Sequence, residues 1–440
     1  MKITVLAGGT RGDVQPLAAV AQKLDELGHS VRFVAHHSFS FLIEGTTIEF
    51  VPAKANDPRE THPASIRARP RNPLGTIRHI RRLGHDYGDK AYLRDVCETS
   101  DFILFSYMCW PAAHIAECLD VPCAAAYLSP HFRTREFPRP VGPVFFHRHR
   151  FGPLWNLFTH RLMERLAQSR DKAWLNRWRQ EDLGLPTLTG APQEWAEQRH
   201  VPRLYGFSPL LLPRPRDWAG WHHVTGYWFW KPPVSWKPPQ DLDDFLSSGS
   251  PPIFISFSSS AVDKSCWSEI VIPAVRESGC RAVIASGWSS IEIRRTDDIF
   301  VVESCPLDWL LSRVSVVVHS CGASTIAEVV RSGKPSICIP MFGEQRFFAA
   351  RLERLGLAHR PLTLKNLGPT ELAEAIKVAI NDDKLLREAD RLRDLVLAED
   401  GTCRAADLIE QIASGKSRQS QPKTGGESPC ISATQKRGIA

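Results

Sequence analysis

The sequence predicts an α/β protein built from two doubly wound domains that face each other across a central cleft. Its 440 residues exceed what a single hydrophobic core usually holds, so two domains are expected. Short β-branched runs alternate with helical patterns in both halves, which is typical of parallel sheets covered by helices. A segment rich in proline and tryptophan separates the two series and suits a linker.

The first domain is assigned to residues 1–212. It opens with a buried strand over 2–8, and a helical pattern over 16–30 ends near Gly28. Further strands are expected at 31–35, 47–53, 101–107 and 121–129. Helical patterns follow at 111–120 and, rich in tryptophan, at 155–185.

The second domain is assigned to 251–413, after a linker at 213–250. Its expected strands lie at 251–259, 281–287, 299–304, 314–320 and 335–340. Residues 414–440 form a basic tail, poor in apolar side chains, that we expect to be disordered. Because ligands of such sheets bind at the carboxyl ends of the strands, we expect the site between the two domains.

Composition favours a reduced, cytoplasmic protein. The eleven cysteines include no C-x-x-C pair, so neither a zinc site nor a disulfide framework is expected. No apolar run approaches the ~20 residues of a membrane span, and no signal peptide is expected. The net charge of +7 is concentrated in the tail and in 59–94. The latter is either a solvated basic face or a surface for phosphates or anionic lipid, which allows peripheral membrane contact. No nucleic-acid partner is expected.

The stretch "VVVHSCGASTIAEVV" (316–330) passes from a β-branched run to a helix through small residues. Unsatisfied N–H groups at such a helix start can bind a phosphate. His319 and the hydroxyls of Ser324 and Thr325 would add side-chain hydrogen bonds to a diphosphate. The alternative is that Thr325 and Glu328 form a T-x-x-E capping box, which requires no ligand.

Glu344 and Gln345 begin another helix after the next strand. A carboxylate beside an amide can both accept from and donate to the hydroxyls of a sugar. The alternative is that both are polar residues of a first helical turn, where the helix dipole favours an acid.

These segments resemble a known family. The stretch Cys305–Leu357 is similar to the donor signature of family 1 glycosyltransferases with the GT-B fold, which has two Rossmann-like domains, and "PLDWLL" within it resembles the sterol 3-β-glucosyltransferase branch. "GTRGDVQP" (Gly9–Pro16) is similar to the hallmark of that branch and of bacterial antibiotic glycosyltransferases. "DWAGWHHVTGYWFW" (Asp217–Trp230) resembles the segment before the linker in sterol-type enzymes.

The resemblance implies roles for individual residues. His319 would contact the donor diphosphate, and the loop matching Ser304–Leu307 would flank the base. The other donor-binding positions it implies are Arg11, Gly12, Ser259, Cys305, Ser320, Gly322, Ser324, Thr325, Glu328, Glu344 and Gln345. If Glu328 matches the ribose-binding glutamate of plant members, Ser320 rather than His319 takes the place of their histidine, and both alignments stay open.

Several positions depart from the family pattern. Cys321 and Ser324 stand where glycine is common, and Ser258 and Ser259 replace a Gly-Ser pair. Glu344 replaces the more usual aspartate. The added side chains would narrow the pocket, so we expect an altered donor sugar or slow turnover.

Asp13 has two roles open to it. Asp13 suits an N-cap for the helix that follows. The resemblance implies instead that Asp13 is the base that deprotonates the acceptor hydroxyl, and that Arg11 orients either Asp13 or a phosphate. Direct displacement predicts inversion at the sugar carbon. The scheme requires no metal and no cofactor, because the UDP-sugar is a co-substrate. The only D-x-D triplet, Asp241 to Asp243, follows the linker and is interpreted as solvated charge.

The expected reaction moves a hexose, glucose by expectation, from a UDP-sugar to a hydroxyl of a hydrophobic acceptor such as a sterol or terpenoid. The stretches 106–114 and 127–132 follow buried strands and could line the acceptor pocket, with Trp110, His131 and Phe132 as candidate residues. "FFHRHRF" (145–151) could rest on a membrane. Alternatives are an antibiotic glycosyltransferase using a dTDP- or UDP-sugar and a non-catalytic nucleotide-sugar binder. A dinucleotide-dependent oxidoreductase is disfavoured, because G-x-G-x-x-G is missing.

Overall fold

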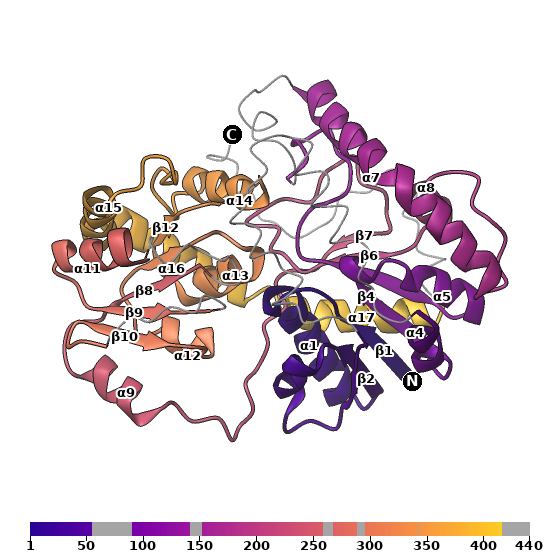
Figure 1. Cartoon of the computed structure of the whole chain (residues 1–440), viewed down its shortest axis with the longest axis horizontal. Coiled ribbons are helices and arrows are strands. Elements are labelled where there is room, and N and C mark those ends of the chain that lie inside the picture. The colour runs from indigo at the N-terminus through magenta and orange to yellow at the C-terminus, as the bar shows by residue number, and fades with distance from the viewer. Residues whose placement is uncertain (55–89, 141–151, 258–266, 288–294, 342, 416–440) are drawn as a thin grey trace, which may run out of the picture.

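The computed structural model describes residues 1–54, 90–140, 152–257, 267–287, 295–341 and 343–415. Figure 1 shows two lobes side by side, each with a sheet at its centre. The sheets have seven strands, in the order β3-β2-β1-β4-β5-β6-β7, and five strands, in the order β10-β9-β8-β11-β12. All pairings between these strands are parallel. The expected α/β fold with two doubly wound domains is confirmed.

The N-terminal sheet consists of strands whose middles are apolar because helices cover both faces. They are β1 (Lys2–Leu6), β2 (Ser30–Ala35), β3 (Glu49–Pro52), β4 (Phe102–Ser106), β5 (Cys123–Tyr127), β6 (Arg203–Tyr205) and β7 (His222–Val224). Its helices are α1 (Arg11–Glu26), α4 (Lys90–Cys97), α5 (Ala112–Leu119), α7 (Pro153–Glu181) and α8 (Pro192–Gln198), with short 3₁₀ helices η1 (His37–Ile43) and η3 (Tyr107–Cys109).

The C-terminal sheet is smaller and follows the same pattern. Its strands are β8 (Ile253–Ser256), β9 (Ala282–Ala285), β10 (Ile299–Val302), β11 (Val317–His319) and β12 (Ser336–Cys338). The helices are α9 (Gln240–Ser247), α11 (Ile272–Ser278), α12 (Leu307–Leu311), α13 (Ala323–Ser332), α14 (Gly343–Arg354), α15 (Pro369–Asn381) and α16 (Asp383–Leu397), with a π-helical turn η4 (Trp267–Val271) before α11.

The domain boundaries differ from those expected at residues 212 and 413. β7 lies inside the predicted linker, yet it pairs with β6 in the N-terminal sheet. The last helix of the described residues, α17 (Gly401–Ala413), belongs to the first lobe, where Ala405, Ala406 and Ile409 are buried in one cluster with the strands and with α1. Trp228 and Trp230 enter the same cluster, so much of the tryptophan-rich segment is core rather than linker.

Helix α1 begins at Arg11, five residues before the start expected at Pro16. Thr10 is its N-cap, and Asp13 is the third helical residue of a capping box with Thr10. Asp13 is therefore not the N-cap that the sequence offered as one alternative. Gly9 precedes the cap with a φ of 111°, a conformation that a side chain would strain.

Across the described parts of the chain, no helix has both the length and the apolar character that a bilayer crossing demands. Some sequence-based expectations fall outside the described residues. They concern Ser258 and Ser259, most of the basic stretch 59–94, the 145–151 segment and nearly all of the tail.

Candidate functional site

The N-terminal ends of α1 and α13, which belong to different lobes, meet at the boundary between the sheets. The hydroxyl of Ser324, in the first turn of α13, donates a hydrogen bond to the backbone carbonyl of Gly12, in the first turn of α1. The approach is close, since a Cβ at Gly12 would lie 3.3 Å from Ser324 Oγ. This junction is where the sequence placed the ligand site.

Asp13 lies next to that junction and is half-buried. Its Oδ2 accepts hydrogen bonds from the backbone N–H of Thr10 at 2.8 Å and from the Thr10 hydroxyl at 2.9 Å. Oδ1 makes no hydrogen bond with the described part of the chain. Burial raises the pKa of Asp13, while the two hydrogen bonds from Thr10 oppose the shift. One carboxylate oxygen thus caps the helix and the other is left for a further partner.

Arg11 extends from α1 to the second lobe. Its guanidinium donates to the hydroxyl of Ser304, in the loop after β10, and to Gln15 Oε1 at 2.8 Å, and it lies over the ring of Phe41 at 5.3 Å. Burial lowers the pKa of Arg11, and Glu328 opposes that shift. The cation is therefore fixed between the lobes by contacts on both sides.

Glu344, in the first turn of α14, faces the first lobe. Its carboxylate accepts a hydrogen bond from the hydroxyl of Ser129, and Oε2 lies 3.9 Å from His131 Nε2. Burial raises the pKa of Glu344 to about 7, Ser129 opposes this, and the charge of Asp13 adds to it. Burial also lowers the pKa of His131 to about 3, so its contact with Glu344 involves a neutral imidazole. The carboxyl groups of Asp13, on α1, and Glu344, on α14, thus interact electrostatically across the junction.

Gln345 and Cys305 lie deeper in the C-terminal lobe than Glu344. Gln345 is 4% exposed, and its Oε1 accepts from the backbone N–H of Met341 at 2.8 Å. Cys305 is 8% exposed, and burial raises its pKa to about 12. Both residues shape the loops beside the junction.

The turn into α13 differs from one alternative drawn from the sequence. Gly322 is the N-cap, so Ser324 and Thr325 are the second and third helical residues. A capping box between Thr325 and Glu328 would require Thr325 to be the N-cap, so this box does not form. The first turn of α13, whose N–H groups are not used within a helix, lies at the junction with α1, and such a helix start can bind a phosphate.

Glu328 lies on the buried side of α13. Arg331 Nε is 3.3 Å from Glu328 Oε2, and Arg331 also pairs with Asp308 at 3.3 Å. Burial raises the pKa of Glu328 to about 7, although Arg331 opposes the shift. A cavity of about 270 Å³ opens beside these three residues and is bordered by Lys334 and Arg393.

His319 ends β11 but does not line the junction. Its side chain is 0% exposed, and Nδ1 accepts a hydrogen bond from the backbone N–H of Cys321 at 3.2 Å. Ser320 is 1% exposed. This position differs from the expectation that the imidazole faces a diphosphate. An apolar strand buried on both faces gives no sequence signal for which way its last side chain turns.

The candidate acceptor residues are divided between two environments. His131 stacks near Tyr107, with ring centroids 4.8 Å apart, beside Glu344. Phe132 instead packs against His222 at 4.4 Å, and Trp110 packs on His114 at 5.9 Å. Phe132 and Trp110 are thus part of the packing of the first lobe.

Tyr107, Tyr127 and Ser129 surround the same region, and they lie in 106–114 and 127–132, the two stretches that the sequence offers for the acceptor pocket. Ser129 contacts Glu344, and Tyr107 stacks with Tyr127 at 6.0 Å. Their only sequence signal is that each follows or ends a predicted strand, at the edge where parallel strands present their carboxyl ends.

Two family models match the chain, one in each lobe. Residues 3–138 match the glycosyltransferase family 28 N-terminal domain, which includes α1 and Asp13. Residues 308–396 match the UDP-glucoronosyl and UDP-glucosyl transferase model, which includes α13 and α14. The two helix ends that meet at the junction therefore lie in segments that match two different glycosyltransferase models.

Curated relatives are similar over most of the chain. The sterol 3-beta-glucosyltransferase of Sclerotinia sclerotiorum is 30% identical over 430 residues, which is 93% of this chain and 29% of that protein. The enzyme of the same name from Emericella nidulans is also 30% identical over 430 residues, with 93% and 30% coverage. The chain thus spans about three tenths of the length of these relatives.

Solved structures support the fold. The glycotransferase of kitacinnamycin superposes with a TM-score of 0.66 at 20% identity, covering 93% of this chain and 98% of that one. SnogD from Streptomyces nogalater, a glycosyltransferase, gives a TM-score of 0.63 at 19% identity, with 93% and 99% coverage. The chain therefore has the GT-B fold, carries a glycosyltransferase domain in each lobe, and is similar in sequence to sterol 3-beta-glucosyltransferases.

Proposed function

We propose that the protein transfers a hexose from a nucleotide-sugar donor to a hydroxyl of a lipophilic acceptor, with inversion at the anomeric carbon. UDP-glucose and a sterol are the proposed pair, in keeping with the names of its relatives. The observation that carries the proposal is the meeting of the α1 and α13 N-termini through Gly12 and Ser324, with the carboxyl of Asp13 beside them.

In the proposed reaction, Asp13 is the general base. Oδ2 stays bound to Thr10, while the unengaged Oδ1 takes the proton of the acceptor hydroxyl. The acceptor oxygen then attacks the anomeric carbon from the side opposite the diphosphate. The carbon–oxygen bond to the diphosphate breaks, and its electron pair leaves with that group. The raised pKa of Asp13 makes the carboxylate a stronger base than an exposed aspartate.

The leaving diphosphate acquires negative charge as this bond breaks. We assign its stabilisation to the free N–H groups of the first turn of α13 and to the hydroxyls of Ser324 and Thr325. Arg11 supplies a fixed positive charge on the other side of the junction. His319 supports this turn from inside through the N–H of Cys321. This scheme uses the protein's own groups and needs no metal or cofactor.

The donor sugar is proposed to lie against Glu344, whose carboxyl has a pKa of about 7 and can accept or donate a hydrogen bond near neutral pH. The acceptor is proposed to approach over Tyr107, Tyr127 and His131, whose rings offer an apolar surface that ends at Ser129 and Glu344. Such a surface suits a flat polycyclic alcohol.

A donor-by-acceptor panel tests the function. The purified chain is incubated with UDP-glucose, UDP-galactose or dTDP-glucose and with a sterol, a triterpenoid or a macrolide. Products are identified by mass spectrometry and the anomeric linkage by NMR. The proposal expects a β-glucoside of the sterol from α-linked UDP-glucose. An α-linked product contradicts the inverting step. Nucleotide binding without consumption of any donor supports the non-catalytic alternative.

A further inference from the structure

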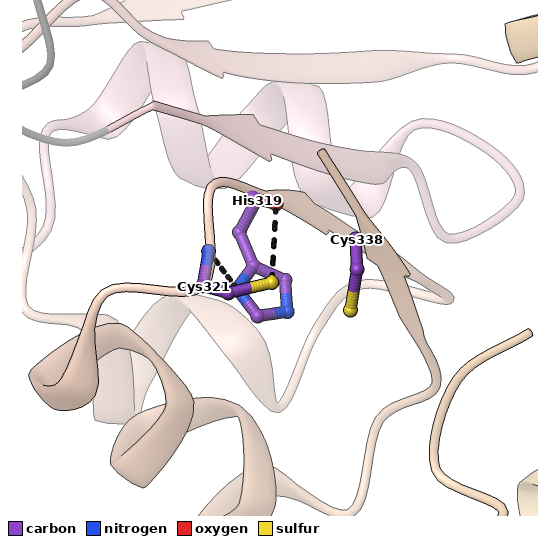
Figure 2. A group of neighbouring side chains, drawn as sticks. All are labelled: His319, Cys321 and Cys338. Carbon is purple, nitrogen blue, oxygen red and sulfur yellow. Dashed lines mark hydrogen bonds between the residues drawn. The ribbon is translucent and has the colours of Figure 1, made fainter. Parts of the chain in front are cut away.

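One histidine and two cysteines lie close together inside the C-terminal lobe. The proposed transfer does not use this cluster directly. The three residues are His319, Cys321 and Cys338, with 0%, 0% and 2% of their surfaces exposed. Their donor atoms all lie within 4.8 Å of one another. Figure 2 shows the Cys321 sulfur close to the His319 ring, with Cys338 facing them from the neighbouring strand.

The fold brings these side chains together for identifiable reasons. His319 and Cys338 are paired in register on the neighbouring strands β11 and β12, so their side chains leave the same face of the sheet. Cys321 follows two residues after His319 with a φ of 65°, in the left-handed region that side chains seldom adopt. A cysteine held there, where glycine would be unstrained, directs its sulfur back toward the strand ends.

The hydrogen bonds fix the state of the imidazole. A backbone N–H can only donate, so Nδ1, which accepts from Cys321, carries no proton. The proton of the neutral ring is therefore on Nε2. Nε2 is buried and has no hydrogen-bond partner among the described residues. In Figure 2 it lies on the side of Cys338, whose sulfur can receive the N–H when it is a thiolate.

The two cysteines differ in acidity in a complementary way. A hydrogen bond from Cys321 lowers the pKa of Cys338, and His319 acts in the same direction. Burial raises the pKa of Cys321 well above its usual value. Cys338 is thus the sulfur that loses its proton more readily and Cys321 the one that keeps it, which is the combination that disulfide formation uses.

We propose that Cys321 and Cys338 are a redox-active dithiol that a hydroperoxide oxidises to a disulfide, with the Nε2–H of His319 directed at the reacting Cys338 sulfur. The thiolate of Cys338 attacks a peroxide oxygen, the O–O bond breaks and hydroxide leaves, forming a sulfenic acid. The thiol of Cys321 then attacks that sulfur, and water leaves after taking up the thiol proton. Two thiols and one H₂O₂ give one disulfide and two H₂O.

The tautomer of His319 decides between a disulfide and a metal centre. A metal at Nε2 would require the proton to move to Nδ1, where it would oppose the N–H of Cys321. A disulfide forms without moving this proton. The sulfur atoms must approach to about 2.0 Å, which moves the left-handed turn at Cys321.

Cys321 is followed directly by Gly322 and then by Ser324, at the start of α13, where the donor diphosphate is proposed to bind. This start, residues 322–325, is called the donor turn. We therefore expect oxidation to weaken nucleotide binding, and this second consequence rests on the proposed function. The oxidation of the two thiols does not rest on the proposed function, so disulfide formation and nucleotide binding are measured in separate experiments.

The first experiment follows the thiols in the intact chain. The reduced protein is treated with H₂O₂, quenched in acid, alkylated and digested with trypsin. Cys321 and Cys338 fall in separate tryptic peptides, 314–331 and 332–346, each with a single cysteine, so a linked pair identifies the disulfide. We expect this linked pair as the main oxidised product, reversed by dithiothreitol. H₂O₂ should react faster than oxidised glutathione because the sulfurs are covered.

Variants separate the roles. Cys321→Gly, which fits the left-handed turn, should abolish the linked pair and leave Cys338 as a sulfenic acid that a dimedone-type probe captures. His319→Gln should slow the loss of the Cys338 thiol at pH 7 by about tenfold or more, because less thiolate is present. Cys97→Ala removes another fully buried thiol and should leave the linked pair unchanged.

Three results would overturn the proposal. One is full alkylation of both cysteines after H₂O₂ treatment, and another is linkage to other cysteines instead. The third is a zinc or copper ion retained in native mass spectrometry and lost in Cys338→Ala, which identifies a metal centre.

The second experiment titrates UDP into the reduced and oxidised protein by calorimetry. We expect at least about threefold weaker binding after oxidation in the wild type and no change in Cys321→Gly. If the reduced protein does not bind UDP, the proposed function fails while the thiol result stands. Equal UDP affinity in both states, with the disulfide formed, removes only the coupling to the donor turn.

Discussion

The hydroxyl of Ser324 donates to the carbonyl of Gly12, although 312 residues separate them in the chain. This carbonyl is free because residue 16, which would supply its helical N–H partner, is a proline. Pro16 thus leaves an acceptor at the start of α1, and the donor comes from the other lobe. A proline that interrupts the hydrogen bonds of one helix creates a contact between two domains.

Loss of this contact should weaken donor binding. Ser324→Ala removes one hydrogen bond between the lobes and one hydroxyl from the proposed diphosphate site. A typical hydrogen bond contributes about 1 kcal/mol, so we expect UDP affinity to fall about fivefold. Calorimetry measures it. The matched control is Ser278→Ala, whose hydroxyl also donates to a carbonyl, that of Val275, but in α11. Equal effects of both variants would contradict the role of the junction.

Asp13→Asn should abolish transfer while preserving the helix start. Asparagine can still accept from Thr10, so α1 remains capped, but it cannot take a proton from the acceptor. We expect kcat to fall about 10²–10⁴-fold with UDP affinity nearly unchanged. Steady-state assays with UDP-glucose and the best acceptor measure this. Asp243→Asn makes the same change in α9 and should keep wild-type activity, as expected if the D-x-D triplet holds no metal. Activity that survives in Asp13→Asn would point to a different base.

Glu344 should make stability depend on pH. Its folded pKa, about 7, lies above the ordinary value of 4.5, so the folded state binds this proton more tightly. The resulting stability is full below about pH 4.5 and is lost as pH rises through 7. Glu344→Gln removes the dependence. We expect the free energy of unfolding of the wild type to drop relative to the variant by about 2 kcal/mol between pH 5 and pH 8.

Urea unfolding at several pH values measures this difference. Glu374→Gln, at an exposed position of α15, is the control and should follow the wild type across the pH range. A constant difference between wild type and Glu344→Gln from pH 5 to pH 8 would show that the carboxyl is not perturbed.

Gly9 should be required for the position of Asp13. A Cβ at Gly9 would lie 2.6 Å from Asp13 Oδ2, and the φ of 111° is already unfavourable for a side chain. We expect Gly9→Ala to lose at least about 1 kcal/mol of stability and most activity. Gly28→Ala, at a φ of 83° with nothing within 4 Å, tests backbone strain alone. It should lose comparable stability and keep its kcat. Parallel thermal melts and assays decide the matter.

The sequence predicted the fold well because both series of strands are short, apolar runs with helical patterns between them. It failed at the boundaries for two physical reasons. The pairing of β7 with β6 and the return of α17 to α1 are long-range contacts that leave no local pattern. The early start of α1 was missed because Pro16 looks like a first helical residue, where proline is favoured.

The site was predicted in part for similar reasons. Arg11, Gly12, Asp13, Ser324 and Glu344 do come together, since they follow the carboxyl ends of parallel strands. The inward turn of His319 could not be read from β11, because an apolar strand buried on both faces shows no alternation. The contact of Ser129 with Glu344 depends on how the lobes meet. Ser259 remains a prediction because it lies outside the described residues.

The placement of α17 in the first lobe has a consequence for biosynthesis. Residues 405–409 complete a hydrophobic cluster that begins at Ile3, so the N-terminal lobe is finished only after the strands and helices of the C-terminal lobe have been synthesised. Until then, the flank of α1 that α17 covers is open to solvent and to chaperones. During synthesis, the first lobe therefore cannot complete its core until α17 has left the ribosome.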